Sequence, residues 1–326
     1  MRFLYLILLT CVAMADTAST LRPEVNEALD RAIELEHQGK IREAEQTILN
    51  VIRDCRDESL ELGAALNNLA VLYLATDRYA DAEQQFMRSI RVLKTLRGEL
   101  AEQVLARTKL HLAALYIETG RGREADKLDL RPLVHILHAP EDKTRAKSAL
   151  AGLAMLRKEL DAAEQMYLEV LSFWREPSRA ASSQTEIATV LNNLGVIALW
   201  QHRPEVAQTR LEQSFAAWQS ILGPESPTLA KAMTNVATVC MQLRQYDDAV
   251  KWLGRAGTIA RSAFGELHPF SIGTQFAYAE ALKKAGRKWE ARQVSKSASQ
   301  ARRSMRSPST SDYTVDYREF SERPRR

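Results

Sequence analysis

The sequence predicts an all-α protein built from stacked helix pairs, on three observations. Glycine (13) and proline (10) are scarce among 326 residues, and a chain rich in Ala, Leu, Glu, Arg and Gln favours helix throughout. The pentapeptide "YADAE" at residues 79–83 returns in related forms along the chain. The stretch "LNNL" at residues 66–69 returns at residues 191–194. Such self-similarity indicates one elongated array of repeats.

Two sets of small residues fix the length of the repeat. In every unit the second small residue follows the first by 12 positions, and successive units are 38, 43, 38, 44, 42 and 42 residues apart. This spacing predicts seven units with a period of about 42 residues. The first set is Ala32, Ala70, Ala113, Ala151, Gly195, Ala237 and Ala279, and the second is Ala44, Ala82, Ala125, Ala163, Ala207, Ala249 and Ala291.

Each unit reads as two antiparallel helices. The second helix carries apolar residues three and four positions apart, and one small residue in each helix permits close approach of the two. The break between them falls at a glycine or a polar residue: Gly39, Asp77, Gly120, His202, Arg244 and Gly286. The third unit is expected to be irregular, because Asp129 takes the place of a large apolar residue and Pro132 interrupts the second helix.

This pattern resembles the tetratricopeptide repeat. Leu69-Ala70, Tyr73, Ala82 and Phe86 match its spacing best. The longer period, the "LNNLA" core and the loops at residues 222–230 and 264–272 resemble the kinesin-light-chain variety. The resemblance implies a right-handed α–α solenoid of about seven pairs over residues 22–305, with a capping helix at its C-terminal end.

The first 15 residues are interpreted as a signal peptide. A positive end and the apolar run "FLYLILLTCV" precede the small residues "AMA". The run is shorter than the roughly 20 apolar residues that cross a bilayer. Two alternatives remain: a lipoprotein signal using Cys11, which would give membrane association, and a buried first helix. We therefore expect an exported protein, periplasmic or extracellular, with a bacterial envelope favoured.

The C-terminal segment 306–326 is expected to be a disordered, basic tail, because it is rich in Ser, Pro and Arg. Within it, Tyr313, Val315 and Tyr317 alternate as in a strand that could extend a partner's sheet. Removal of the signal leaves two cysteines, Cys55 and Cys240. They lie five repeats apart, too far for a disulfide, and Cys240 is predicted to be a core residue.

The repeated asparagines are candidate ligand contacts. The family resemblance implies that the first helix of each pair lines a concave groove, and that residues just before the small residue contact a bound peptide. These are Asn67, Asn68, Asn192, Asn193 and Asn235. A carboxamide both donates and accepts hydrogen bonds, so it can hold a peptide backbone of any sequence. The alternative is that the asparagines bond to the neighbouring repeat and fix the stacking.

Three basic residues lie near these asparagines. The resemblance places Arg107, Arg145 and Lys231 on the groove rim, where they would attract an acidic side chain or a C-terminal carboxylate. A solvated rim is the alternative. His111 replaces the asparagine in the third unit and can be a polar filler.

The sequence contains little that suggests catalysis. His135 and His138 form H-x-x-H without further ligands at metal spacing, and none of the common nucleophile, phosphate-loop or metalloprotease motifs is present. We expect no metal and no cofactor. The 45 basic and 41 acidic residues are mixed along the chain, which argues against a nucleic-acid partner. The predicted function is a non-catalytic scaffold that binds a protein or an extended peptide. The alternative is a structural subunit that assembles through its convex surface or its ends.

Overall fold

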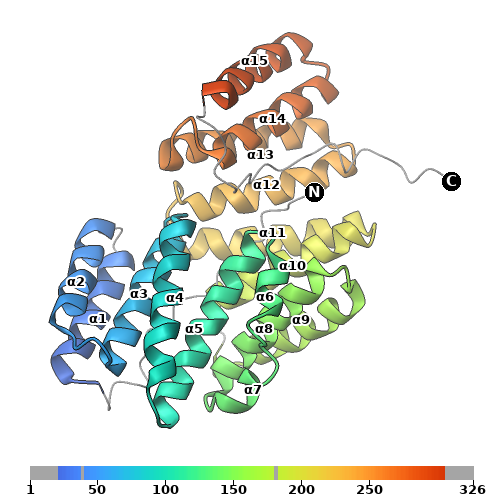
Figure 1. Ribbon diagram of the computed structural model, residues 1–326. Coiled ribbons are helices and arrows are strands. Elements are labelled where there is room, and N and C mark those ends of the chain that lie inside the picture. Colours follow the sequence, from blue (N-terminus) through green and yellow to red (C-terminus); the bar gives the residue numbers. More distant parts are fainter. Residues whose placement is uncertain (1–20, 38–39, 180–182, 305–326) are drawn as a thin grey trace. The chain divides into compact units, whose positions relative to one another are not determined.

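The computed structural model describes residues 21–37, 40–179 and 183–304. In this part of the chain all regular structure is helical, in seven successive pairs (Figure 1). The all-α solenoid prediction is confirmed. The pairs are α1 (Pro23–His37) with α2 (Ile41–Asp54), α3 (Leu60–Ala75) with α4 (Tyr79–Thr95), α5 (Glu99–Glu118) with the short α6 (Gly122–Asp126) and α7 (Leu133–Ile136), α8 (Pro140–Leu156) with α9 (Leu160–Trp174), α10 (Gln184–Trp200) with α11 (Pro204–Ile221), α12 (Pro227–Gln242) with α13 (Tyr246–Phe264), and α14 (Pro269–Lys284) with α15 (Lys288–Ser304).

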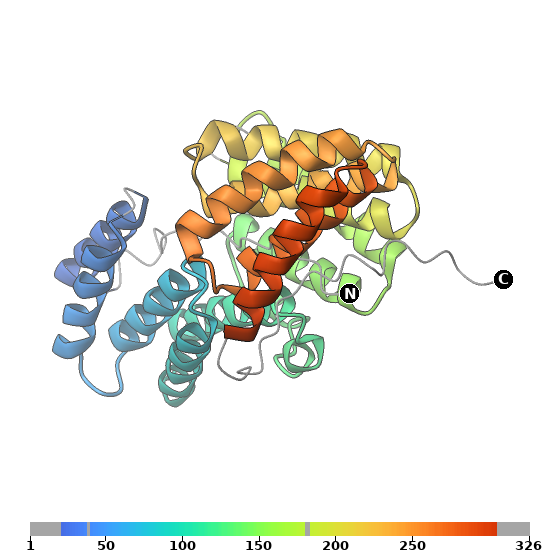
Figure 2. The ribbon, with the colours of Figure 1, turned by 90° about the horizontal axis from the view of Figure 1, so that it is seen from above.

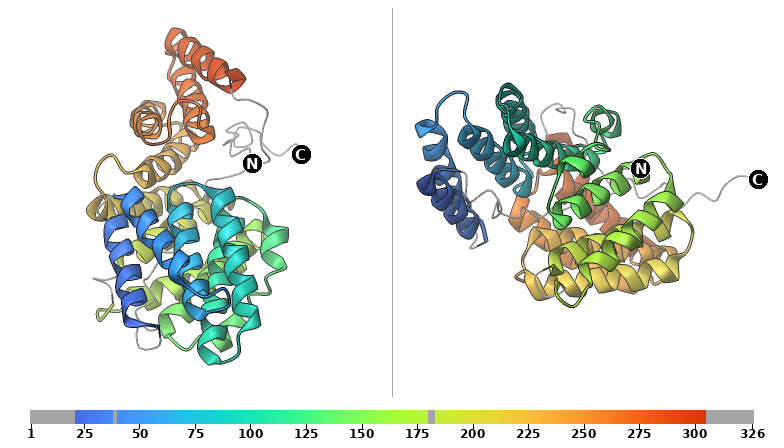
Figure 3. Two further views of the ribbon diagram at one scale, coloured as in Figure 1. Left: turned by 60° about the vertical axis from the view of Figure 1, so that its left-hand side comes forward. Right: turned by 90° about the horizontal axis from the view of Figure 1, so that it is seen from below.

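The described residues fall into two units. The N-terminal unit holds residues 21–117 and 121–153, and the C-terminal unit holds residues 154–304 together with residues 118–120. Within the C-terminal unit each helix from α9 to α15 packs on the next (Figure 2). Within the N-terminal unit α1 to α4 pack in the same succession (Figure 3).

From the second pair to the seventh, the turn inside the pair has one residue in the left-handed region. It lies seven positions after the first small residue, at Asp77, Gly120, Lys158, His202, Arg244 and Gly286, with φ between 56° and 84°. The next backbone N–H then bonds back to the carbonyl five residues earlier, as from Arg203 to Ala198 at 2.8 Å, which closes the end of the first helix. The predicted breaks are confirmed, except for Gly39, which lies outside the described residues.

The third pair is irregular, as predicted. Its second helix stops at Asp126, and Asp129 adopts φ 47°. This turn places Leu130 and Leu133 in the core, where they are 3% and 2% exposed and pack with residues of α5 and α8. The irregular segment therefore still covers its neighbours.

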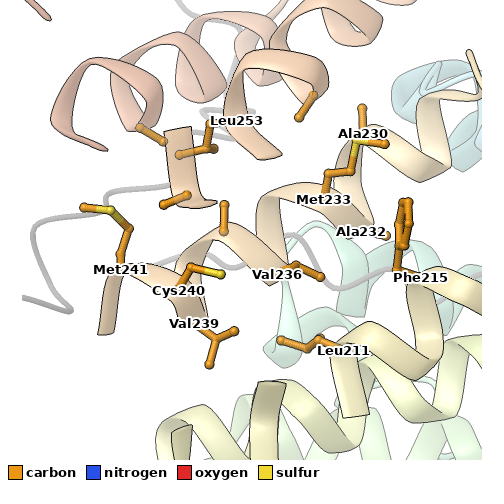
Figure 4. Close-up of a cluster of buried hydrophobic side chains, with 14 of the residues drawn as sticks. Leu211, Phe215, Ala230, Ala232, Met233, Val236, Val239, Cys240, Met241 and Leu253 are labelled. Atoms are coloured by element: carbon orange, nitrogen blue, oxygen red, sulfur yellow. The ribbon is translucent and has the colours of Figure 1, made fainter. Parts of the chain in front are cut away.

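Close helix contacts explain the small residues of the repeat. All fourteen members of the two sets are buried. At Gly195 even a methyl group would meet Leu211, since a Cβ built there lies 2.6 Å from the Cγ of that leucine. In the C-terminal unit these contacts close a core across α11 to α13 around Leu211, Met233 and Val236 (Figure 4).

Cys240 is 2% exposed within that core, as predicted, and Cys55 and Cys240 are both free thiols. No helix among the described residues has the length and apolar character that a membrane span requires. The signal-peptide and tail predictions fall on residues 1–15 and 306–326, outside the described residues. The predicted capping segment is the later part of α15, which is the second helix of the last pair.

Candidate protein-binding surface on the first helices

Hydrogen bonds between side chains connect the first helices of neighbouring repeats. In the N-terminal unit Asn67 of α3 and His111 of α5 bond at 2.9 Å between Oδ1 and Nδ1. Asn67 is 2% exposed. Burial lowers the pKa of His111 to about 4, so this imidazole is neutral at physiological pH. The histidine at this place is therefore a partner of the asparagine one repeat earlier.

The same connection in the C-terminal unit spans three helices. Asn235 of α12 donates to Asn192 of α10 at 2.8 Å. Asn192 donates to Asn193 at 3.3 Å, and Asn193 donates to the hydroxyl of Tyr167 on α9 at 3.0 Å. All three asparagines are 5% exposed or less. We call these bonds, with the Asn67–His111 bond, the asparagine ladder.

The ladder bears on the two roles considered for the asparagines. Asn67, Asn192 and Asn235 contact a neighbouring repeat, as the stacking alternative expects. Asn68 differs from them because its side chain is partly exposed. Contact between these asparagines and a ligand stays a prediction. Among the five asparagines, Asn68 has the most accessible amide.

The basic residues are more enclosed than a solvated rim would be. Arg107 of α5 and Arg145 of α8 both pair with Asp142, at 2.7 Å and 3.2 Å, and their side chains are 13% and 11% exposed. Lys231 of α12 lies 3.4 Å from Glu118 and its side chain is 9% exposed. The two guanidinium groups thus contact the same carboxylate.

Sequence reasoning missed Asp142. It lies in the first turn of α8, 35 residues after Arg107, and only the stacking of α5 on α8 brings the two together. The sequence did contain a signal for this pair. The first turn of α8 is acidic, and α5, which is the first helix of the preceding pair, carries a basic residue at Arg107.

Polar residues lie along one face of α12, which is the first helix of its pair. Lys231, Thr234, Asn235 and Thr238 are spaced by three and four positions and are all buried. Both threonine hydroxyls bond to the backbone carbonyl four residues earlier, at 2.9 Å and 2.8 Å. Thr189 of α10 and Thr274 of α14 make the same bond. Neighbouring first helices thus share a polar stripe whose hydroxyl donors are satisfied locally.

A second repeated contact, which was not expected from the sequence, joins the second helices α2 and α4 to the pair that follows each of them. Glu83 of α4 accepts from the hydroxyl of Tyr116 at 2.9 Å and from Arg121 at 2.5 Å. Glu45 holds Tyr73 and Arg78 in the same way, and the bond raises the pKa of Tyr73 to about 12 together with burial. The glutamate that ends "YADAE" therefore marks a link between repeats.

The two histidines of H-x-x-H are not brought together with further ligands. His138 lies 3.0 Å from Glu99, and His135 belongs to the one-turn helix α7. Among the described residues no three side chains of His, Cys, Asp or Glu form a group that would hold a metal ion.

The repeats match family models. Two tetratricopeptide repeat models match residues 62–103, and residues 186–256 and 228–304. The matched segments are tetratricopeptide repeats. Such a fold is generally an interaction scaffold without catalytic activity.

Curated relatives match part of the chain. A clustered mitochondria protein homolog of Aspergillus oryzae is 25% identical over 189 residues, which cover 57% of this chain and 15% of that protein. The protein KINESIN LIGHT CHAIN-RELATED 3 of Arabidopsis thaliana is 21% identical over 220 residues, 66% of this chain and 33% of that protein. The chain therefore spans only a minor part of the length of these relatives.

Solved structures share the fold. BtubC (BKLC) from P. vanneervenii has a TM-score of 0.56 at 22% identity, covering 72% of this chain and 94% of that one. A Rap protein complexed with Competence and Sporulation Factor has a TM-score of 0.62 at 12% identity, covering 86% and 77%. At these identities the likeness extends to the fold alone, and with the relative from Arabidopsis it supports the kinesin-light-chain-like variety of the repeat.

Proposed function

We propose that this chain is a non-catalytic scaffold that binds a protein or peptide partner, with an extended segment of the partner lying against the first helices. The observation that carries the proposal is the polar stripe shared by α10, α12 and α14. Burying polar side chains is unfavourable unless they are hydrogen-bonded, and apolar residues would suffice for stacking alone. The stripe itself is buried, and its recurrence in register from repeat to repeat suits a partner segment whose backbone offers hydrogen-bonding groups at a regular spacing.

The ladder and the exposed amide have separate tasks in this proposal. The ladder holds successive first helices at a fixed spacing. Asn68, which lies beside it and is partly exposed, offers amide donors and an acceptor to the backbone of the bound segment. Asn193 and Asn235 contribute where the segment displaces one of their bonds to a neighbouring residue.

The basic residues would set a preference for acidic partners. Arg107 and Arg145 both contact Asp142, and a carboxylate of the partner would compete with Asp142 for hydrogen bonds from these two guanidinium groups. In the C-terminal unit Lys231, which pairs with Glu118, would exchange its carboxylate partner in the same way. A partner with acidic side chains or a free C-terminal carboxylate fits this arrangement.

The Rap protein of like fold was solved with a bound factor, which supports ligand capture by this architecture. We also propose that the protein is exported. N-terminal sequencing of the protein recovered from the envelope fraction tests that step, and a first residue of Asp16 is expected.

The experiment that tests binding compares capture of partners by three forms of the full chain. Asn68→Ala is expected to lose the partner and keep its melting temperature. Met87→Ala, which changes an exposed residue of the second helix α4, is the matched control and is expected to keep the partner. The Asn68/Asn193/Asn235→Ala triple variant is expected to lose both partner and stability. Retention of the same partner by all three forms would contradict the proposal and favour assembly through the convex surface or the ends.

A further inference from the structure

The first and last helices of the array carry opposite charge. Helix α1 has five acidic residues and one basic residue, and α15 has five basic residues and one acidic residue. Over the whole chain the two signs nearly balance, at 45 basic and 41 acidic residues. The first and the last of the described helices are therefore charged with opposite sign.

The charges lie on the exposed faces of these helices. The buried face of α1 is apolar and packs on α2 and α3, while its exposed residues are Glu24, Glu27, Arg31 and Glu34. Helix α15 buries Ala291 and Ala298. Its exposed residues include Trp289, Arg292, Lys296 and Arg303, which are spaced by three, four and seven positions. Each of these two helices thus exposes charges of mainly one sign.

The helix dipole does not account for this distribution. The dipole favours acidic residues in the first turn of a helix and basic residues in the last. Glu34 and Glu36 lie near the C-terminal end of α1, and Lys288 is the first residue of α15. These three charges oppose the dipole, whereas Glu24, Arg302 and Arg303 accord with it.

Trp289 gives the basic end an apolar anchor. Its exposed fraction of 72% is the highest among the large hydrophobic residues that the structure describes. Trp and Arg are enriched at the centres of protein interfaces, which is the environment that this face offers.

We propose that the partner of these faces is a second copy of this chain, with the acidic face of α1 in one copy docking on the basic face of α15 in the next. The charge complementarity resides within one sequence, so no other chain is required. Contact between two α15 faces, or two α1 faces, would bring like charges together. The contact therefore pairs unlike faces, α1 of one copy with α15 of another. Although α1 is also a first helix, this association uses its exposed residues Glu27 and Glu34 and not Asn68 of α3, so the two proposals are tested by different variants.

Sedimentation velocity of the full chain across a range of concentrations tests the proposal. We expect the average mass to rise with concentration in low salt. Raising the salt to about 0.5 M, where the Debye length falls well below 10 Å, weakens the association at least about tenfold. Trp289→Ala is expected to weaken it by about tenfold in low salt as well, because an interface anchor is lost.

Charge reversal gives the sharper comparison. Glu27→Lys/Glu34→Lys and Arg292→Glu/Lys296→Glu each change exposed residues, and each variant alone is expected to stay monomeric. An equimolar mixture restores complementary faces and is expected to associate as the wild type does. Glu205→Lys/Glu212→Lys makes the same charge change on the exposed side of α11 and is expected to leave association unchanged. Melting curves confirm that all variants are folded.

Three results would overturn the proposal. One is a wild-type chain that stays monomeric at every concentration in low salt. Another is a mixture of the two reversed variants that fails to associate. The third is association that survives both reversals, which would assign the contact to another surface.

Discussion

At the scale of single residues, the left-handed turn position is where the sequence is least suited to its backbone. Arg244 has φ 60°, a conformation that costs an L-residue roughly 1–2 kcal/mol and glycine little. Glycine loses more freedom on folding, which offsets about half of the gain. Arg244→Gly is therefore expected to raise the free energy of unfolding by about 0.5–1 kcal/mol in urea denaturation. Arg244→Ala is the control, and an equal gain there would assign the effect to lost charge instead of backbone strain.

A second prediction for single residues concerns the asparagine ladder. Asn235→Ala leaves the Oδ1 of Asn192 without its 2.8 Å donor, and an unsatisfied buried acceptor costs about 1–3 kcal/mol. Asn68→Ala removes a partly exposed side chain and is expected to change the free energy of unfolding by less than about 0.5 kcal/mol. Chemical denaturation of both variants measures the difference. Equal losses would mean that Asn68 also belongs to the stack.

At the scale of helices, the small residues of the repeat determine how closely two helices can pack. Gly195→Ala gains about 1 kcal/mol in helix propensity. The new methyl would lie 2.6 Å from Leu211, and overpacking of that kind costs about 1–3 kcal/mol. We expect overpacking to dominate, so the melting temperature falls.

Gly254→Ala is the matched control for this prediction. Its Cβ would lie 3.5 Å from Tyr278, an ordinary contact, so the propensity gain of up to about 1 kcal/mol should remain. A stabilised Gly195→Ala variant would show that α10 and α11 can move apart without loss.

Helix pairs could be predicted from the sequence because their signal is local. The 12-residue spacing of small residues and the breaks at Asp77 or Gly120 involve one pair at a time. Pro132 and Asp129 likewise marked the irregular third pair from neighbouring positions. The partner of each polar side chain could not be predicted in this way. Asn192 and Asn235 are 43 residues apart, and Arg107 meets Asp142 only once helices of different repeats are stacked.

At the scale of the whole molecule, the buried imidazole of His111 couples stability to pH. Burial lowers its pKa from 6.5 to about 4, and Asp142, Arg107 and Arg145 are the charged groups around it. The unfolded chain binds the proton first as the pH falls. The stabilisation from the neutral imidazole is therefore complete above pH 6.5 and is lost between pH 6.5 and about 4, by about 3 kcal/mol in total.

His111→Asn tests this dependence. An asparagine stands at the equivalent place in other repeats, as Asn193 does, and it can still bond to Asn67. The variant is expected to lose less stability than the wild type between pH 6.5 and 4, measured by urea denaturation at each pH. If the free energy of unfolding falls equally with pH in the two proteins, the acid sensitivity is due to groups other than His111.

Site-specific photo-crosslinking tests the central claim most directly, namely that a partner lies against the first helices. A photoreactive residue is placed at position 75 on α3, and at position 87 on α4 as the control. Ala75 is exposed and lies seven positions after Asn68, on the same face of the helix, so the amide of Asn68 is kept. Met87 is 40% exposed, so it is accessible to any molecule that meets the second helices. We predict one defined adduct from position 75 and none of that mass from position 87. The same adduct from position 87 alone would contradict the account.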